Sequence, residues 1–281
     1  MLHKIRVSAI QRLCVQDGPG VRTTVFLKGC YLACPWCCNP ETIHYDQNLY
    51  FEKNSQVCGS SKICKRCVVY GGCQPKEHCL LGAYEKTYVD YEVNDLLSLI
   101  ERDMSLFKKG GGVTISGGEP LMQASQLYPL LTILRQRGVN IAIETSLYAP
   151  HTNFDLLKDL VDYWLVDVKF QFGFISYIEK DKYKKDFELN LNFIQEQSQN
   201  NCLYRMVLSQ QALPHTEAIL KRLLKYQIPS LEILACHQLA ANKYKQLGLS
   251  VPLFSSPSDE ELKRFSKYIN DKGIKTTILN L

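Results

Sequence analysis

The sequence predicts an α/β fold in which six β/α units form a partial barrel. Three observations favour this fold: short apolar runs of strand length, segments of helical periodicity that alternate with them from residue 85 onward, and polar motifs at the ends of several runs. Such alternation implies parallel strands with the helices packed outside, and ligands then bind at the carboxyl ends of the strands. A chain of 281 residues, 46% hydrophobic and 22% charged, is long enough to bury one such core.

The expected strands are short apolar runs, and the expected helices carry apolar residues three and four positions apart. The strands are Val21–Leu27, Gly112–Ser116, Asn140–Thr145, Trp164–Lys169, Leu203–Leu208, Leu231–Cys236 and a closing strand, Ile274–Leu279. The helices cover 93–107, Leu121–Arg137, Asn153–Val161, a polar stretch near 176–198, Thr216–Lys225 and a last helix that ends at Gly273. Gly138 predicts the end of the second helix, and Ser258 with Glu261 predicts a capping box before the last one.

Twelve cysteines are present, and nine of them lie between Cys30 and Cys79. The even count permits disulfides, but the amino terminus lacks the apolar run of a signal peptide, and thiolates two or three residues apart suit a metal centre better. Residues 54–84 break the β/α pattern, since they hold five of these cysteines and little apolar periodicity. We therefore expect a barrel domain of residues 1–53 and 85–281 with a cysteine-rich insert at 54–84.

The charge and hydropathy of the chain exclude some classes of partner. The net charge of +5 is too weak a bias to favour nucleic acid. No apolar run reaches the length that spans a bilayer, so no membrane association is expected. Together with the lack of a signal peptide, these features lead us to expect a cytoplasmic protein.

The segment Gly29–Cys37 carries the spacing C-x3-C-x2-C in Cys30, Cys34 and Cys37. A [4Fe–4S] cluster has four irons, so three thiolates leave one iron open, whereas a ferredoxin cluster with four cysteines leaves none. An open iron can bind the amino and carboxylate groups of S-adenosylmethionine (SAM), and a reduced cluster can then break one of its C–S bonds. The alternative is a zinc knuckle, but zinc usually takes four ligands, and no fourth lies nearby unless Cys38 serves.

The residues on both sides of this triad resemble a known family. The runs Asp17–Cys30 (DGPGVRTTVFLKGC) and Cys37–Glu41 (CCNPE) closely resemble the glycyl-radical-enzyme activating enzymes of the radical SAM superfamily, whose type member is pyruvate formate-lyase activase. The resemblance covers nearly the whole chain apart from the insert. One departure is Cys38, where members of the family often carry His or Ser.

The resemblance implies an oxidoreductase that cleaves SAM at a [4Fe–4S] cluster on the catalytic residues Cys30, Cys34 and Cys37. The 5′-deoxyadenosyl radical then abstracts a Cα hydrogen from a glycine of a partner, a glycyl radical enzyme, under anaerobic conditions because oxygen destroys the product radical. Flavodoxin or ferredoxin is the implied electron donor. Two alternatives stay open: a radical SAM enzyme that acts on a small molecule or peptide, and a ferredoxin-like electron carrier.

The resemblance also implies a SAM site at the ends of three further strands. Ser116–Pro120 (SGGEP) ends the second strand, where glycines let the backbone approach a ligand closely, although the bare motif equally fits a turn. Glu144–Ser146 ends the third strand, with a helix N-cap at Ser146 as the alternative. Asp167–Lys169 forms a D-x-K motif on one strand face. In the family such groups lie near the methionine end of SAM, around a monovalent cation, and a glycine often stands where this chain has Leu147.

The candidate SAM-binding residues come from these segments and from the cysteine triad's neighbours. They are Trp36, Cys38, Gly117, Gly118, Glu119, Glu144, Thr145, Ser146, Asp167 and Lys169, of which Asp167 and Lys169 are also candidate catalytic residues.

Two further candidates lie on later strands. Leu231–His237 (LEILACH), followed by Lys243–Tyr244, resembles the family's L-P-Y-H…K-Y segment, with Ala235–Cys236 in place of Pro-Tyr. The resemblance places His237 beside the ribose or carboxylate of SAM, and it matches Arg205 to the arginine of the fifth strand. A surface histidine and an ordinary salt bridge are the alternatives for these two residues.

The insert carries cysteines at the spacing C-x5-C-x2-C-x5-C-x5-C. They are Cys58, Cys64, Cys67, Cys73 and Cys79. Many members of the family have ferredoxin-like inserts with one or two further [4Fe–4S] clusters, and five cysteines suffice for one. We expect an auxiliary cluster on Cys58, Cys64, Cys67 and Cys79, with Cys73 as the spare or substitute; zinc and no metal are the alternatives. A segment with so little core needs such a centre to fold.

Overall fold

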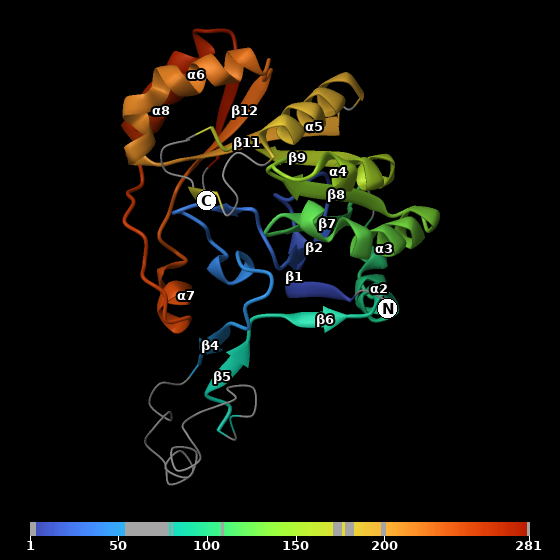
Figure 1. Ribbon diagram of the computed structural model, residues 1–281. Coiled ribbons are helices and arrows are strands. Elements are labelled where there is room, and N and C mark those ends of the chain that lie inside the picture. Colours follow the sequence, from blue (N-terminus) through green and yellow to red (C-terminus); the bar gives the residue numbers. More distant parts are fainter. Residues whose placement is uncertain are drawn as a thin grey trace.

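A computed structural model describes residues 4–53, 79, 81–107, 110–170, 176–177, 183–197 and 201–279. Within them, one large sheet of nine strands has the order β13-β12-β11-β9-β8-β7-β2-β1-β6 (Figure 1). Its strands are β1 Ile5–Cys14, β2 Arg22–Leu27, β6 Val89–Tyr91, β7 Gly112–Gly117, β8 Asn140–Thr145, β9 Tyr163–Asp167, β11 Cys202–Leu208, β12 Ser230–Ala235 and β13 Lys275–Leu279. Two small sheets pair β3 (Leu32–Ala33) with β10 (Ser176–Tyr177), and β4 (Tyr50–Glu52) with β5 (Tyr84–Lys86).

Seven neighbouring strands of the large sheet, in the order β2, β7, β8, β9, β11, β12 and β13, are all parallel. They match the seven apolar runs that the sequence predicts. The prediction of a parallel α/β barrel is therefore confirmed. Two antiparallel strands, β1 and β6, extend the sheet beyond β2 and were not predicted. The end strands β6 and β13 do not pair with each other, so the barrel stays open on one side.

The helices follow the strands in the expected alternation. They are α2 Val93–Glu101, α3 Ala124–Gln136, α4 His151–Leu157, α5 Lys184–Gln197, α6 Thr216–Lys225, α7 Ala241–Gln246 and α8 Asp259–Asn270. Most lie on the outer face of the curved sheet, whereas α7 lies apart from them, beside β4 (Figure 1). The predicted range of α6 is confirmed residue by residue, and the capping box of α8 is present, with Ser258 and Glu261 bonded to each other's backbone N–H groups.

Several helices differ from their predicted ranges. Helix α3 covers Ala124–Gln136 rather than Leu121–Arg137, since Pro120–Gln123 form a 3-10 turn, and α8 ends at Asn270 rather than at Gly273. Helix α2 ends at Glu101 rather than at residue 107, because the buried Asp103 leaves the helical path to accept hydrogen bonds from Arg12 and Thr23. Helix α4 covers His151–Leu157, and a 3-10 turn takes up the rest of its predicted range. Helix α5 begins at Lys184, since residues 176–177 of the predicted helix form β10 instead.

The end of the sheet opposite the carboxyl ends of its strands is held by Arg22, whose side chain is fully buried. Its guanidinium donates to Thr114 Oγ1 at 2.6 Å, to the carbonyls of Pro19 and Val113 at 2.8 and 2.7 Å, and to Asn140 Oδ1 at 3.0 Å. Burial lowers the pKa of Arg22 to about 10, which leaves the group charged at neutral pH. The arginine of the DGPG-x-R run thus ties β2 to β7 and β8.

Replacing Arg22 with alanine should destabilise the protein by about 3 kcal/mol or more, since several buried acceptors lose their donor at once. Arg22→Lys should recover part of this loss, because a single ammonium keeps the charge but not the planar fork. The measurement is the free energy of unfolding in urea. Arg264→Ala is the matched control, because Arg264 pairs with Glu260 on the exposed face of α8. Equal stability of the Arg22→Ala and Arg264→Ala proteins would contradict this role.

Candidate active site

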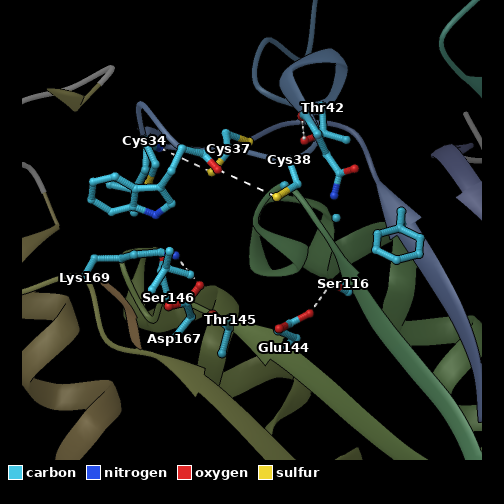
Figure 2. A pocket seen from close by; sticks show the side chains of 18 residues that line it. Cys34, Cys37, Cys38, Thr42, Ser116, Glu144, Thr145, Ser146, Asp167 and Lys169 are labelled. Atoms are coloured by element: carbon cyan, nitrogen blue, oxygen red, sulfur yellow. Dashed lines mark hydrogen bonds and ion pairs between the residues drawn. The ribbon is translucent and has the colours of Figure 1, made fainter. Parts of the chain in front are cut away.

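A cavity of about 230 Å³ lies where β2, β7, β8 and β9 reach their carboxyl ends. It is lined by Phe26, Cys30, Leu32, Cys34, Trp36, Cys37, Cys38, Asn39, Thr42, Ser116, Gly117, Gly118, Glu144, Thr145, Ser146, Asp167, Lys169 and Val207. Figure 2 shows the cysteines on one wall and the polar groups of β8 and β9 on the wall opposite. The sequence motifs thus meet around one space.

The three triad cysteines lie in the segment after β2, and backbone hydrogen bonds within this segment hold its shape. Cys37 N donates to Cys34 O at 3.0 Å, and Cys30 N donates to Ile43 O at 2.9 Å. Burial raises the pKa of Cys34 to about 11 and that of Cys37 to about 12, and the neighbouring thiols add to the second shift. The metal-free thiols are therefore protonated at neutral pH, and iron must displace their protons to bind.

The donor set fits an iron–sulfur cluster. Cys30, Cys34 and Cys37 line one cavity. Burial is the largest cause of the raised pKa of Cys30, and Cys34 and Cys37 lie close enough to raise it further. Among the described residues, no group of three His, Cys, Asp or Glu side chains is placed so that it could hold a single metal ion. A cubane cluster makes a different demand, because each thiolate binds the iron at a different corner.

Two buried polar atoms of the cavity residues have no hydrogen-bond partner within the part of the chain that the structure describes: the indole Nε1–H of Trp36 and the Oδ1 atom of Asp167. Buried polar groups in proteins normally have hydrogen-bond partners, so this donor and this acceptor need a polar ligand. The other oxygen of Asp167 accepts a hydrogen bond from Lys169 Nζ. Burial disfavours the charge on Lys169, but Asp167 and the thiol of Cys34 raise its pKa above the ordinary value.

The glycines of the SGGEP segment allow the end of β7 to touch the cluster loop. A Cβ atom on Gly118 would lie 2.1 Å from the carbonyl oxygen of Gly29, and one on Gly117, where φ is +108°, would lie 2.2 Å from Leu27 N. The next residue donates its backbone N–H to Gly29 O at 2.7 Å. A side chain at either glycine would push the two motifs apart.

Glu119, a predicted SAM-binding residue of this segment, does not line the cavity. Its buried carboxylate accepts hydrogen bonds from Thr145 Oγ1 at 2.6 Å, from Ser146 N and Oγ at 2.9 and 2.7 Å, and from Leu121 N at 3.3 Å. Burial raises the pKa of Glu119, and these donors oppose the shift. The carboxylate therefore fixes the loop after β8, while Thr145 and Ser146 still border the cavity.

Arg205 also lies outside the cavity lining. Its guanidinium donates to Glu232 Oε2 at 3.1 and 3.3 Å and pairs with Glu144 Oε1 at 3.5 Å. Ser116 Oγ donates to the other oxygen of Glu144 at 2.5 Å. Burial raises the pKa of Glu144, and the charge of Arg205 opposes that shift. Arg205 thus holds a cavity carboxylate in place, and no sequence motif predicted its other partner, Glu232.

Helix α7 holds the cluster loop from outside. Lys243 Nζ donates to Asn39 Oδ1 at 2.8 Å and to Glu41 Oε1 at 2.7 Å, and Tyr244 Oη donates to Cys37 O at 3.3 Å. His237 does not line the cavity; its Nε2 lies 3.6 Å from Cys38 Sγ. Its Nδ1 accepts a hydrogen bond from the backbone N–H of Leu239, which leaves Nε2 as the protonated nitrogen of the neutral ring.

The loop after β8 turns at Leu147, where the resemblance leads one to expect glycine. Leu147 keeps the left-handed backbone of a glycine, with φ of +64°, and its side chain is fully buried. A left-handed conformation costs a residue with a Cβ roughly 1–2 kcal/mol. The unusual residue therefore leaves the turn in place and adds strain to it.

Four cysteines of the insert, Cys58, Cys64, Cys67 and Cys73, lie outside the described residues, so the expected auxiliary centre stays a prediction. Cys79 is described and is a half-buried free thiol. Among the residues that the structure covers, no helix has both the length and the apolarity that a membrane span requires.

Comparisons with known proteins agree with this arrangement. A family model described as a 4Fe-4S single cluster domain matches residues 16–186. The choline trimethylamine-lyase activating enzyme of Oleidesulfovibrio alaskensis is 31% identical, over 99% of this chain and 98% of its own. The indoleacetate decarboxylase activating enzyme of Tractidigestivibacter scatoligenes is 28% identical, over 98% and 97%. The solved structure of native anSMEcpe with bound AdoMet (SAM) has the same fold, with a TM-score of 0.55 and 14% identity over 89% of this chain and 61% of that one.

The contacts of α7 predict that Lys243→Met weakens the hold on the cluster loop, because Glu41, a buried carboxylate, loses its cation. Lys243 is partly exposed, so we expect a cost of ~1 kcal/mol after solvent screening, or roughly fivefold faster iron loss. The measurement is the decay of the cluster's visible absorbance after a chelator is added to reconstituted protein. Lys245→Met, on the exposed side of the same helix, is the control. Equal decay rates for the two variants would refute the clamp.

Proposed function

Since the chain belongs to the glycyl-radical-enzyme activating enzymes of the radical SAM superfamily, we propose that it installs a glycyl radical on a partner enzyme after cleaving SAM at a [4Fe–4S] cluster. The observation that carries this function is the single cavity in which Cys30, Cys34 and Cys37 face the ionic groups of Asp167 and Lys169. A fourth cysteine ligand, as in a ferredoxin, is not needed there, because SAM would bind the iron that the three cysteines leave open.

The cluster, when bound, supplies the electron that breaks a C–S bond of SAM. Lys169 keeps a positive charge beside the triad, which suits the carboxylate of SAM and the negative cluster. The unpartnered Oδ1 of Asp167 suits its amino group, and the indole N–H of Trp36 provides a donor to the nucleoside. The exposed backbone at Gly117 and Gly118 lies within the same lining.

Glu144 and Thr145 complete the proposed SAM site. Glu144 is held by Arg205 and Ser116, so that its carboxyl group borders the cavity near Asp167. Two carboxylates in one lining favour a monovalent cation between them, which would also accept the carboxylate of SAM as a ligand. His237 reaches the site through Cys38 and would meet SAM only at the rim of the cavity.

The proposed partner is a glycyl radical enzyme, with flavodoxin or ferredoxin as the electron donor. The relatives are named for activating a choline trimethylamine-lyase and an indoleacetate decarboxylase, which favours the activase over the enzyme that acts on a small molecule. The strands β6 and β13 do not pair, and we propose that a loop of the partner approaches the cavity from this open side of the sheet. A glycine suits this approach, because it has no side chain to fit. Activation of a pyruvate formate-lyase-type enzyme is one of the activities that this proposal includes.

The cysteines of residues 54–84 are proposed to hold an auxiliary [4Fe–4S] cluster on Cys58, Cys64, Cys67 and Cys79, with Cys73 in reserve. Four thiolates in a short segment with little apolar periodicity support a metal centre, since such a segment has little else to fold around.

The activase function predicts an EPR-visible glycyl radical on the partner and about one SAM consumed per radical formed. The test mixes anaerobically reconstituted enzyme, reductant and SAM with candidate glycyl radical enzymes of the same genome. Cys34→Ala should give neither the radical nor 5′-deoxyadenosine, because the triad loses a ligand. Cys202→Ala, a free thiol on β11 outside the cavity, should behave as wild type. Silent partners together with many turnovers of a small metabolite would favour the rival enzyme instead.

The proposed auxiliary centre predicts that the triple variant Cys30→Ala, Cys34→Ala, Cys37→Ala keeps about four irons and sulfide after reconstitution. Iron, sulfide and zinc analysis of the purified variant is the measurement. If the variant retained zinc instead, the insert would hold a structural zinc site and not a cluster. If it retained no metal, both interpretations would be ruled out. Adding Cys64→Ala to the triple variant should remove the remaining iron.

A further inference from the structure

The strained turn at Leu147 directly follows two residues of the cavity lining. Thr145 and Ser146 border the cavity, and Leu147 N donates to Thr145 Oγ1 at 2.9 Å. Tyr148 N donates to Ser146 Oγ at 3.4 Å, and this bond spans Leu147, so its geometry depends on the φ and ψ of that residue. The position of the Ser146 hydroxyl in the cavity wall therefore depends on a backbone conformation that leucine disfavours.

Asn190 of α5 supplies the contacts that hold this conformation. It is fully buried, and its Nδ2 group donates to Leu147 O at 3.0 Å and to Ala149 O at 3.2 Å. Its Oδ1 lies 2.7 Å from His151 Nδ1, which acts as the donor. Both amide protons and the amide oxygen are thus bonded, which fixes the orientation of the side chain. The residue lies 43 positions from Leu147 in the chain.

The loop is also held from its other side. Glu119, at the end of β7, accepts hydrogen bonds from Thr145 and Ser146, whereas α5 covers the far side of the loop with Asn190 and with Phe187, stacked on Tyr148 at 4.6 Å. Glu119 contacts only the residues before the turn. The carbonyls of the turn itself bond to Asn190, so the left-handed conformation depends on α5.

We propose that Asn190 is a positioning residue of the SAM site, which makes a left-handed leucine possible where a glycine would adopt that backbone freely. This role rests on the proposed function for its link to SAM. Asn190 does not line the cavity; it acts through the backbone of Leu147 on Ser146. The pair of Leu147 and Asn190 thus performs what a single glycine does without help.

The test is a double-mutant cycle of Leu147→Gly and Asn190→Ala in the full chain. Asn190→Ala alone should raise the Kd for SAM about tenfold in reconstituted protein, measured by anaerobic calorimetry. In the Leu147→Gly background the same change should raise the Kd less than about threefold, because glycine needs no support for a positive φ. Leu147→Gly also leaves a cavity, so the coupling between the two changes, rather than either absolute value, is the quantity compared.

Unfolding of the reconstituted proteins in urea, under anaerobic conditions, is the second measurement, and it needs no SAM. Asn190→Ala should lower the unfolding midpoint more in the wild-type background than in the Leu147→Gly background. Gln195→Ala is the matched control: the Gln195 amide on the same helix donates to Tyr226 O at 2.6 Å, away from the loop, so its effect should be equal in both backgrounds.

Equal effects of Asn190→Ala in both backgrounds, on the Kd and on unfolding, would overturn the positioning role. Wild-type affinity for SAM in the Asn190→Ala protein would do so too. If the wild-type protein bound no SAM, the proposed function would fail, and the coupling seen in urea would still decide whether Asn190 supports the turn.

Discussion

The cavity depends most on one buried carboxylate, that of Glu119. It joins the ends of two parallel strands, β7 and β8, through four hydrogen bonds, and it is removed from water completely. A buried anion is costly unless donors surround it, and here the donors are the residues that shape the cavity wall. The same segment touches the cluster loop through Gly118, where only a glycine fits. One node therefore sets the spacing between the triad and the polar wall opposite.

Elements from the second half of the chain secure the two sides of this node. Helix α7 holds the cluster loop through Lys243 and Tyr244, and α5 holds the turn after β8 through Asn190. The polar groups involved are mostly buried, so each bond to them forms in a low dielectric and loses much if its partner is absent. The site is thus built on the first four parallel strands but stabilised by residues about 40 to 200 positions away.

The sequence predicted the parts of the structure that follow local rules. The seven parallel strands are short segments in which apolar residues recur, and the capping box of Ser258 and Glu261 needs only neighbours within one turn. The sequence did not predict β1, because this strand mixes apolar and charged residues. Only some of its side chains are buried, so it lacks the apolar run of a fully buried strand. The sequence also missed the internal roles of Glu119 and Arg205, since motif spacing identifies which residues gather at a site but not which of them face the ligand.

The polar groups of the cavity are held in place by contacts within the protein. Asp167 and Lys169 are paired, Glu144 is fixed by Arg205, and yet Trp36 Nε1 and Asp167 Oδ1 have no partner in the described structure. An unpartnered buried donor or acceptor destabilises the free protein by about 1–3 kcal/mol, and a ligand that bonds to it recovers that free energy on binding. A rigid wall with two such atoms therefore favours a ligand that presents both an acceptor and a donor. The zwitterionic methionine end of SAM joined to a nucleoside has these groups, which links the strain and the unsatisfied atoms of this fold to the same reaction.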